Sequence, residues 1–248
     1  MTSPLRIGVL GAGVMGAGIA QTLATSGHRA VCTDVSAEAL EQGRREAVEG
    51  RFGIESAVGR GRLSREQADA AIARLEFTES FEEAAASDLV VECVPEKLDL
   101  KMQVFRELDR AAPEHAILAS NSSGLPITAL AQATGRPARV IGWHWASPAP
   151  VMRLAEIVVT PETDPEVRQA VCELAAGCGK NPIVVNDNPM AWGYVANRVY
   201  SAMIREANRV IKEGVATQED VNQLMVDCFR WPTGPFGMVK GASGGWKK

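Results

Sequence analysis

The strongest indication of how this chain folds is the glycine-rich segment 11–16, Gly-Ala-Gly-Val-Met-Gly. It lies between a short apolar run and a helical pattern. The apolar run covers residues 5–10, the helical pattern covers residues 14–26, and a second strand pattern covers residues 29–34. A Gly-x-Gly-x-x-Gly match is informative where a strand precedes it and a helix follows. The glycines permit a tight turn, close approach of the backbone to a diphosphate, and close packing of helix on strand. The segment therefore predicts a strand–helix–strand unit that binds a dinucleotide.

Asp34 ends the second strand, about twenty residues beyond the glycines, where a carboxylate can accept the ribose hydroxyls of an adenosine. That carboxylate would repel a 2′-phosphate, and the next residues, Val35 and Ser36, bring no arginine to offset it. We therefore expect NAD rather than NADP as the cofactor, with FAD as the remaining alternative. The expected cofactor-binding residues of this region are Gly11, Gly13, Met15, Gly16 and Asp34.

Strand and helix patterns continue to alternate along most of the chain. The further strand candidates are residues 88–94, 116–120, 139–142, 154–159 and 182–185. The further helical patterns are a long one at 36–57, one opened by Ser64, those at 98–111 and 126–134, and one opened by Asp164 and Pro165. This alternation predicts an α/β fold of the Rossmann type, a mostly parallel sheet with helices on both faces.

The strand signal stops near residue 188, and helical patterns follow at 194–213 and 218–228. We therefore expect two domains, a dinucleotide-binding domain at 1–187 and a small all-helical domain at 188–248.

The amino-acid composition excludes some classes of binding partner. The net charge of −4 and the absence of a long basic run argue against nucleic acid. No apolar stretch approaches the length of a membrane span, and no export signal is recognisable. The five cysteines contain no Cys-x-x-Cys pair, so we expect a reducing cytoplasm and no metal site. The basic residues that lie close in sequence, compatible with a CoA-like ligand or with a solvated helix face, are Arg51, Arg60, Arg62 and Arg65.

His144 is the best placed of the three histidines. It ends a strand and precedes a loop that contains two prolines, so it should project from the carboxyl edge of the sheet, where such folds bind ligands. Removal of a hydroxyl proton during hydride transfer suits an imidazole that a carboxylate holds at its other nitrogen. Glu156 is the candidate carboxylate, because an unpaired charge inside the apolar strand 154–159 would be costly. By itself, a histidine between tryptophans is also compatible with a satisfied core residue.

Residues 119–128 offer several small hydroxyls at the same edge of the sheet, and a serine nucleophile is the rival interpretation. We discount it because there is no Gly-x-Ser-x-Gly segment and the glycine motif assigns the chemistry to a cofactor.

Four segments together resemble the L-3-hydroxyacyl-CoA dehydrogenase family. They correspond to the family's GAGxMGxGIA opening, its SNTSSLPIT-like strand exit, its HFFNPVPxMxLVEV segment and its PGFxxNR helix entry. In this chain they are residues 11–20, 120–128, 144–157 and 189–198, and the resemblance extends to about Phe236.

The resemblance implies an NAD-dependent oxidation of a 3-hydroxyacyl thioester, or its reverse, with His144 as base and Glu156 as its orienting partner. It further implies that Ser123 and Asn197 position the reacting oxygen. It places Glu96 and Lys101 near the nicotinamide side, although by themselves both residues would be taken for surface charges. The implied substrate carrier is CoA or an acyl-carrier protein, and the implied assembly is a homodimer.

The chain departs from the family pattern in several places. Trp145, Ala146 and Ser147 follow the histidine where the family has two aromatic residues and an asparagine, and residues 190–192 are extra. Both changes point to altered acyl specificity. Lys240 stands where the family has an acidic residue, and the helical domain is shorter than in the family. We therefore expect the dimer contact and the acyl pocket to differ from those of the family.

Three other functions stay open. One is a dehydrogenase of a small free hydroxy acid. The second is a protein that binds NAD(H) without turnover, and the matching histidine, glutamate, serine and asparagine argue against it. The third is the class of hydroxy acid dehydrogenases that use a helical-domain lysine; Lys212, the only lysine of the long helix, has no catalytic surroundings.

Overall fold

The structure is a computed structural model that describes residues 4–244, with side chains described up to Val239. It divides into two compact units, Met1–Tyr194 and Val195–Lys248.

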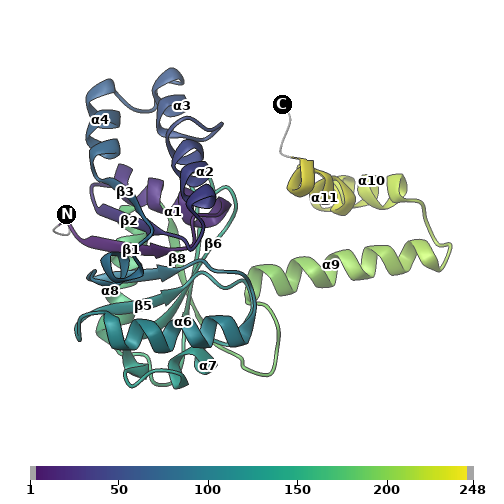
Figure 1. The fold of residues 1–248 in the computed structure, drawn as a ribbon. Coiled ribbons are helices and arrows are strands. Elements are labelled where there is room, and N and C mark those ends of the chain that lie inside the picture. Colours follow the sequence, from purple (N-terminus) through teal and green to yellow (C-terminus); the bar gives the residue numbers. More distant parts are fainter. Residues whose placement is uncertain (1–3, 245–248) are drawn as a thin grey trace. The chain divides into compact units, whose positions relative to one another are not determined.

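The first unit is built on one sheet, which in the described residues has eight strands in the order β3-β2-β1-β4-β5-β6-β7-β8 (Figure 1). All neighbouring strands are parallel except β6 and β7, which are antiparallel. The strands are β1 (Arg6–Leu10), β2 (Arg29–Thr33), β3 (Leu75–Thr78), β4 (Leu89–Glu92), β5 (Ile117–Ser120), β6 (Val140–Trp145), β7 (Leu154–Val159) and β8 (Asn181–Asn186). The chain reverses its direction of winding between β1 and β4, which is where folds of this type bind ligands.

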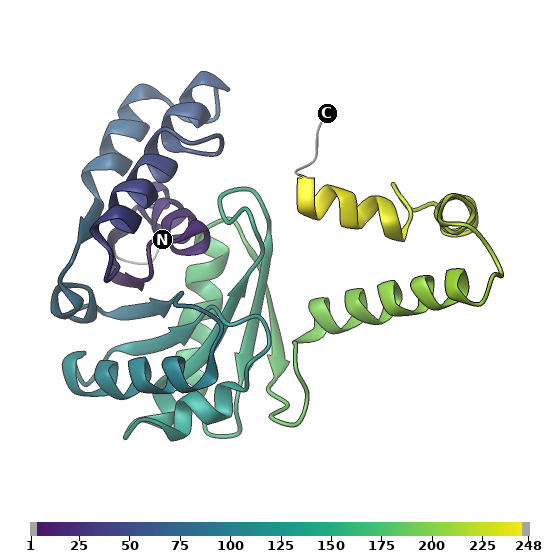
Figure 2. The ribbon, with the colours of Figure 1, turned by 45° about the vertical axis from the view of Figure 1, so that its right-hand side comes forward.

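Helices cover both faces of this sheet (Figure 2). Alternate strand residues form two buried apolar clusters, one with α1 (Val14–Thr25) and α8 (Pro165–Gly177), the other with α5 (Phe81–Ala85), α6 (Leu98–Ala111) and α7 (Ile127–Gln132). The helices α2 (Ala37–Val48), α3 (Ile54–Gly59) and α4 (Arg65–Ala73) follow β2, and a short 3₁₀ helix, Pro137–Arg139, precedes β6. The prediction of a Rossmann-type, mostly parallel sheet is confirmed.

Several local predictions are corrected. The single helix expected at 36–57 is two helices, because the chain turns between them, with the Gly53 amide donating to the Gly50 carbonyl at 2.8 Å. The sequence reading missed β3 and α5, which are short and lack a long periodic pattern. The helix expected after Ser64 is present, and Ser64 and Gln67 form a capping box at its start.

The second unit contains α9 (Val195–Lys212), α10 (Gln218–Phe229) and α11 (Pro235–Gly244). The first two helices were expected, and α11 was missed. Thr217 and Asp220 form a capping box that begins α10, and Gly214, at φ 69°, follows the end of α9. The side chain of Lys240 and all of residues 245–248 lie outside the described part. Within the described residues, no helix has the length and apolar character that crossing a membrane requires.

Candidate active site

The glycine-rich turn connects β1 to α1 as predicted. Gly11 has φ 102°, a conformation that side chains rarely adopt, and a Cβ on Gly16 would lie 1.7 Å from the Gly11 carbonyl oxygen. A Cβ on Gly13 would meet no protein atom within 4 Å, so internal packing does not explain this glycine. No side chain caps the amino end of α1, whose amides therefore stay available to an anion. Met15 contributes a backbone amide to this end, and its side chain packs on the core.

Asp34 lies directly after β2 and supports the turn. Its Oδ2 accepts a hydrogen bond from the Ala12 amide at 2.8 Å, and its Oδ1 accepts one from the Ser36 amide at 3.1 Å. A cavity of about 530 Å³ opens beside it, lined by Gly11, Gly13 and Asp34 and walled by apolar side chains. An apolar cavity next to a carboxylate and a glycine turn fits the adenosine half of NAD. The residues present therefore suit the cofactor.

His144 and Glu156 form a buried pair. Their Nδ1 and Oε2 atoms are 2.7 Å apart, and the two residues face each other across the antiparallel β6–β7 register. Both side chains are almost fully buried. The Tyr194 ring packs edge-on against the imidazole, with the ring centroids 5.7 Å apart, and its hydroxyl donates to the Leu125 carbonyl at 2.8 Å. In the part of the chain described, no hydrogen bond involves Nε2 of His144, so this nitrogen is chemically able to accept a proton.

The tryptophans beside His144 lie on the other face of the sheet, because side chains alternate along a strand. Trp143 and Trp145 are buried in the cluster with α1 and α8, with their ring centroids 4.9 Å apart. Trp145 therefore does not lie next to the imidazole, although it follows His144 in the sequence. The Trp145 amide is held by Asn121 Oδ1 at 3.0 Å, which ties the end of β6 to the loop after β5.

The loop after β5 carries the predicted Ser123 and contacts the predicted Glu96. Glu96 Oε1 accepts hydrogen bonds from the Ser122 hydroxyl at 2.6 Å and from the Ser123 amide at 2.8 Å. Partial burial acts to raise the pKa of Glu96, but the Ser122 hydroxyl and the charge of Lys101 outweigh it and hold that pKa below its ordinary value. The structure thus brings Glu96 and Ser123 together, while their roles toward cofactor and substrate stay predictions.

Lys101 lies inside the protein rather than on its surface. Its ammonium group is 2.6 Å from Glu92 Oε1, 3.2 Å from Glu96 Oε2 and 3.0 Å from the Val94 carbonyl oxygen, so its three protons all have acceptors. Glu92 is fully buried and also accepts from the Ser120 hydroxyl at 2.7 Å. Burial acts to raise the pKa of Glu92, whereas the Lys101 charge opposes that shift.

A second cavity of about 460 Å³ lies on the other side of the glycine turn. Gly13 and α1 form one wall, α2 and Phe52 another, and the loop 148–150 a third. The Arg51 guanidinium stacks over Phe52 at 5.2 Å from the ring centroid. The four arginines that the sequence offered as contacts for a CoA-like ligand are all exposed, and Arg65 forms ion pairs with Glu55 and Asp69.

Asn197 lies in the first turn of α9, in the second unit. Its predicted role in positioning the substrate oxygen therefore stays a prediction.

Sequence reasoning missed three polar residues of this region. Glu92 is a charge in an apolar strand, the same signal that identified Glu156, and it could have been found in that way. Ser120 and Tyr194 carried no such signal, because their partners come from other elements.

Comparisons with known proteins agree with this arrangement. The family model described as "3-hydroxyacyl-CoA dehydrogenase, NAD binding domain" matches residues 6–188, and "3-hydroxyacyl-CoA dehydrogenase, C-terminal domain" matches residues 193–246. The chain is 39% identical over 234 residues to a probable 3-hydroxybutyryl-CoA dehydrogenase of Bacillus subtilis, covering 94% of this chain and 79% of that protein.

Two solved structures are similar throughout. The crystal structure of (S)-3-hydroxybutyryl-CoA dehydrogenase from Ralstonia eutropha has a TM-score of 0.88 and 34% identity, covering 95% of this chain and 81% of that one. A diketoreductase that acts on dicarbonyl compounds has a TM-score of 0.85 and 31% identity, covering 96% and 83%. The chain belongs to the 3-hydroxyacyl-CoA dehydrogenase family and is an NAD-dependent oxidoreductase.

Proposed function

We propose that this protein oxidises a 3-hydroxyacyl-CoA to the 3-ketoacyl form, or catalyses the reverse reduction, with His144 as general base. The observation that carries the proposal is the buried 2.7 Å pair of His144 and Glu156 at the edge of the sheet where the glycine turn also lies. NAD, when bound, accepts the hydride that leaves the carbinol carbon.

His144 takes the hydroxyl proton on Nε2 while Glu156 holds the opposite nitrogen. The carboxylate keeps the imidazole in one orientation and stabilises the imidazolium that forms. Ser123, whose amide is fixed on Glu96, and Asn197 are proposed to donate hydrogen bonds to the oxygen of the reacting carbon. Lys101 is proposed to act on the cofactor side through Glu96, since its own protons are used inside the protein.

CoA is the favoured carrier because the second cavity is largely apolar and has Phe52 and the exposed Arg51 at its side. An apolar groove beside exposed arginines suits a pantetheine arm with a phosphorylated nucleotide at its end. Carrier-protein thioesters remain a variant of the same chemistry.

A second candidate is reduction of a dicarbonyl compound that is not a thioester. It is favoured by the structural similarity to the diketoreductase. In that case the exposed arginines would have no effect on the Michaelis constant.

The two-domain division at 187/188, the homodimer and the cytoplasmic location also remain proposals. Exposed apolar side chains of the helical unit, Val199, Leu224 and Phe229, support a contact between copies. Light scattering on the purified protein would give the mass of the assembly, and a monomer at micromolar concentration would rule the dimer out.

The test of the function is NADH-dependent reduction of acetoacetyl-CoA, followed at the nicotinamide absorbance, for the native protein and His144→Ala. His115→Ala is the matched control, because the His115 side chain is exposed and pairs with Asp88, away from the site. We expect turnover in the native protein and in the control, and a loss of about 1,000-fold in His144→Ala, near the middle of the range of about 100- to 10,000-fold for general acid–base catalysis. Turnover that survives in His144→Ala would contradict the assignment of the base.

A further inference from the structure

Lys180 is a buried cation that the site described above does not use. It immediately precedes β8 and is 6% exposed. Its Nζ donates to the carbonyl oxygens of Ala149 at 2.5 Å and Met152 at 2.8 Å, and lies 4.9 Å from the centroid of the Trp145 ring. Among the described side chains, no carboxylate forms an ion pair with it, and burial lowers the pKa of Lys180.

An ammonium group removed from water is costly unless its protons are satisfied. Two carbonyl dipoles and an aromatic face offset that cost here, and each attraction is stronger in a buried site than in water. An apolar side chain would fill the same space without the cost. The interaction of Lys180 with the backbone of the loop 147–152 is therefore what distinguishes this lysine from a packing residue.

This loop begins two residues beyond β6, the strand that carries His144. Its Pro148, Ala149 and Pro150 form a wall of the 460 Å³ cavity beside the glycine turn. They pack closely on α1, since a Cβ on Gly18 would lie 3.2 Å from Pro150 Cδ and 3.3 Å from Ala149 Cβ. The wall is therefore close-packed on its α1 side.

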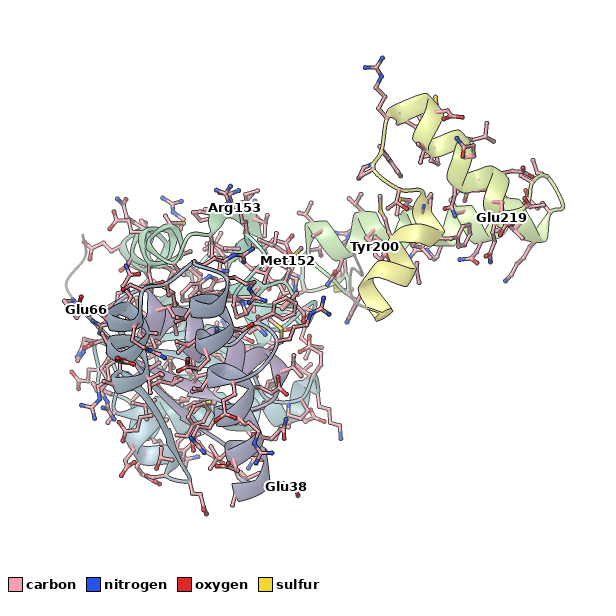
Figure 3. All side chains as sticks on the ribbon, turned by 90° about the horizontal axis from the view of Figure 1, so that it is seen from above. Glu38, Glu66, Met152, Arg153, Tyr200 and Glu219 are labelled. Atoms are coloured by element: carbon pink, nitrogen blue, oxygen red, sulfur yellow. The ribbon has the colours of Figure 1, made fainter. Side chains whose placement is uncertain are left out.

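On the other side, Arg153, directly after the loop, accepts a hydrogen bond from the Asn181 amide at 2.7 Å and donates one to the Asn181 side chain at 2.8 Å, which ties the exit of the loop to β8. The amides of Val151 and Met152 both donate to the Pro148 carbonyl at 3.0 Å, which closes a turn within the loop but does not attach it to the sheet. Met152 and its neighbour Arg153 are labelled in Figure 3, and Met152 is exposed. The two hydrogen bonds from Lys180 connect this turn to the residue that directly precedes the edge strand β8.

We infer that Lys180 is a positioning residue that fixes the loop 147–152, and with it the wall of the cavity that receives the substrate. That Lys180 fixes the loop does not depend on the function of the protein. That it thereby shapes the substrate site rests on the proposed function, which places the acyl-CoA arm in this cavity.

The loop is tested by hydrogen–deuterium exchange of the full chain, native and Lys180→Met. Methionine has a similar length and no charge or donor. We expect the amides of Val151 and Met152 to exchange at least tenfold faster in the variant, while peptides of β1 and β4 stay unchanged. Lys212→Met, in exposed α9, is the control and should match the native protein. Unchanged protection of Val151 and Met152 would overturn the inference.

The effect on the site is tested by steady-state kinetics with acetoacetyl-CoA and NADH. Lys180→Met should raise the KM for acetoacetyl-CoA at least tenfold, with kcat and the Kd of NADH within threefold of native, and Lys180→Arg should recover part of the KM. A merely structural lysine would instead lower the melting temperature and affect both substrates alike. Such a result, or an unchanged KM, would overturn the link to the cavity.

Trp145 supplies an independent signature. Lys180→Met should change the near-ultraviolet circular dichroism, and the change should vanish in the Trp145→Phe background; persistence there would contradict the contact. If the native protein does not reduce acetoacetyl-CoA, the proposed function fails, while exchange and dichroism still decide whether Lys180 fixes the loop.

Discussion

Two buried carboxylates lie near the carboxyl edge of this sheet, and they have different partners. Glu156, on β7, is paired with an imidazole, whereas Glu92, at the end of β4, is paired with the ammonium group of Lys101. The imidazole has a second nitrogen that the described residues leave without a hydrogen bond, while all three ammonium protons have acceptors. The same residue type thus pairs with the proposed base in one place and joins loops in the other.

The difference follows from the elements that meet at each carboxylate. Glu156 faces His144 across two antiparallel strands, so the strand register by itself brings the two side chains opposite each other. Glu92 instead joins β4, the Val94 backbone, α6 and the Ser120 hydroxyl of β5. We therefore expect changes at Glu92 to lower stability first and changes at Glu156 to lower the reaction rate first.

The largest expected effect is on folding. Lys101→Met leaves Glu92 buried without its counterion, which costs about 3–5 kcal/mol. Urea unfolding should show this loss, and the double variant Glu92→Gln with Lys101→Met should recover part of it because no charge is left buried. A loss below about 1 kcal/mol in the single variant would mean that the buried pair contributes little.

The next effect is on the rate. Glu156→Gln keeps the shape of the partner but removes the charge that stabilises the imidazolium, so kcat should fall about 100-fold, equivalent to about 2.7 kcal/mol. Stopped-flow or steady-state reduction of acetoacetyl-CoA measures it. Glu166→Gln, an exposed acid of α8, is the control. If the melting temperature of Glu156→Gln fell as far as that of Lys101→Met, the two carboxylates would not differ in their effect on stability.

Ser120→Ala tests whether the contribution of Glu92 to stability depends on its hydrogen-bond donors. It removes the 2.7 Å hydrogen bond to Glu92 and the acceptor of the Ser122 amide, and bonds to a charged group contribute about 1.5–3 kcal/mol. We expect a loss of about 2 kcal/mol in urea unfolding. Ser56→Ala removes a hydrogen bond to the neutral Arg51 carbonyl and should lose less. Equal losses in the two variants would show that Glu92 does not depend on Ser120.

The smallest effect concerns pH. The pKa of Glu96 lies below its ordinary value of 4.5, so its charged form stabilises the folded state above that value, and this contribution is lost as the pH falls through the lower folded pKa. As the pH falls below about 5, the melting temperature of Glu96→Gln should therefore decrease less than that of the native protein. Parallel melting curves for the two proteins over that range would contradict the charge-based role.

Much of the architecture was predictable because it depends on local patterns. The apolar runs and their alternation with helical periods predicted the order of most strands and helices, and capping residues such as Ser64 and Asp164 marked helix starts. The short elements β3 and α5 were missed because four or five residues carry too little periodicity. The long helix at 36–57 was wrong because helix-forming residues surround the turn at Gly50 and Gly53.

The candidate site was predictable in part. A charge inside an apolar strand identified Glu156, and the same rule would have found Glu92. Lys101 could not be placed, because whether a lysine on an amphipathic helix faces solvent or the interior depends on what packs against it. The edge contact of Tyr194 with His144 joins residues fifty positions apart, and no local pattern predicts it.

The dinucleotide turn could be predicted from local sequence, because the glycines and Asp34 act within one strand–helix–strand unit whose geometry is local. The partners of the buried charges, in contrast, depend on how distant segments pack together. The β6–β7 register sets His144 against Glu156, and the loop 147–152 meets Lys180 from the start of β8. Such pairings depend on strand order and register, which bring distant residues within hydrogen-bond distance, and the energy of a buried charge depends on those neighbours.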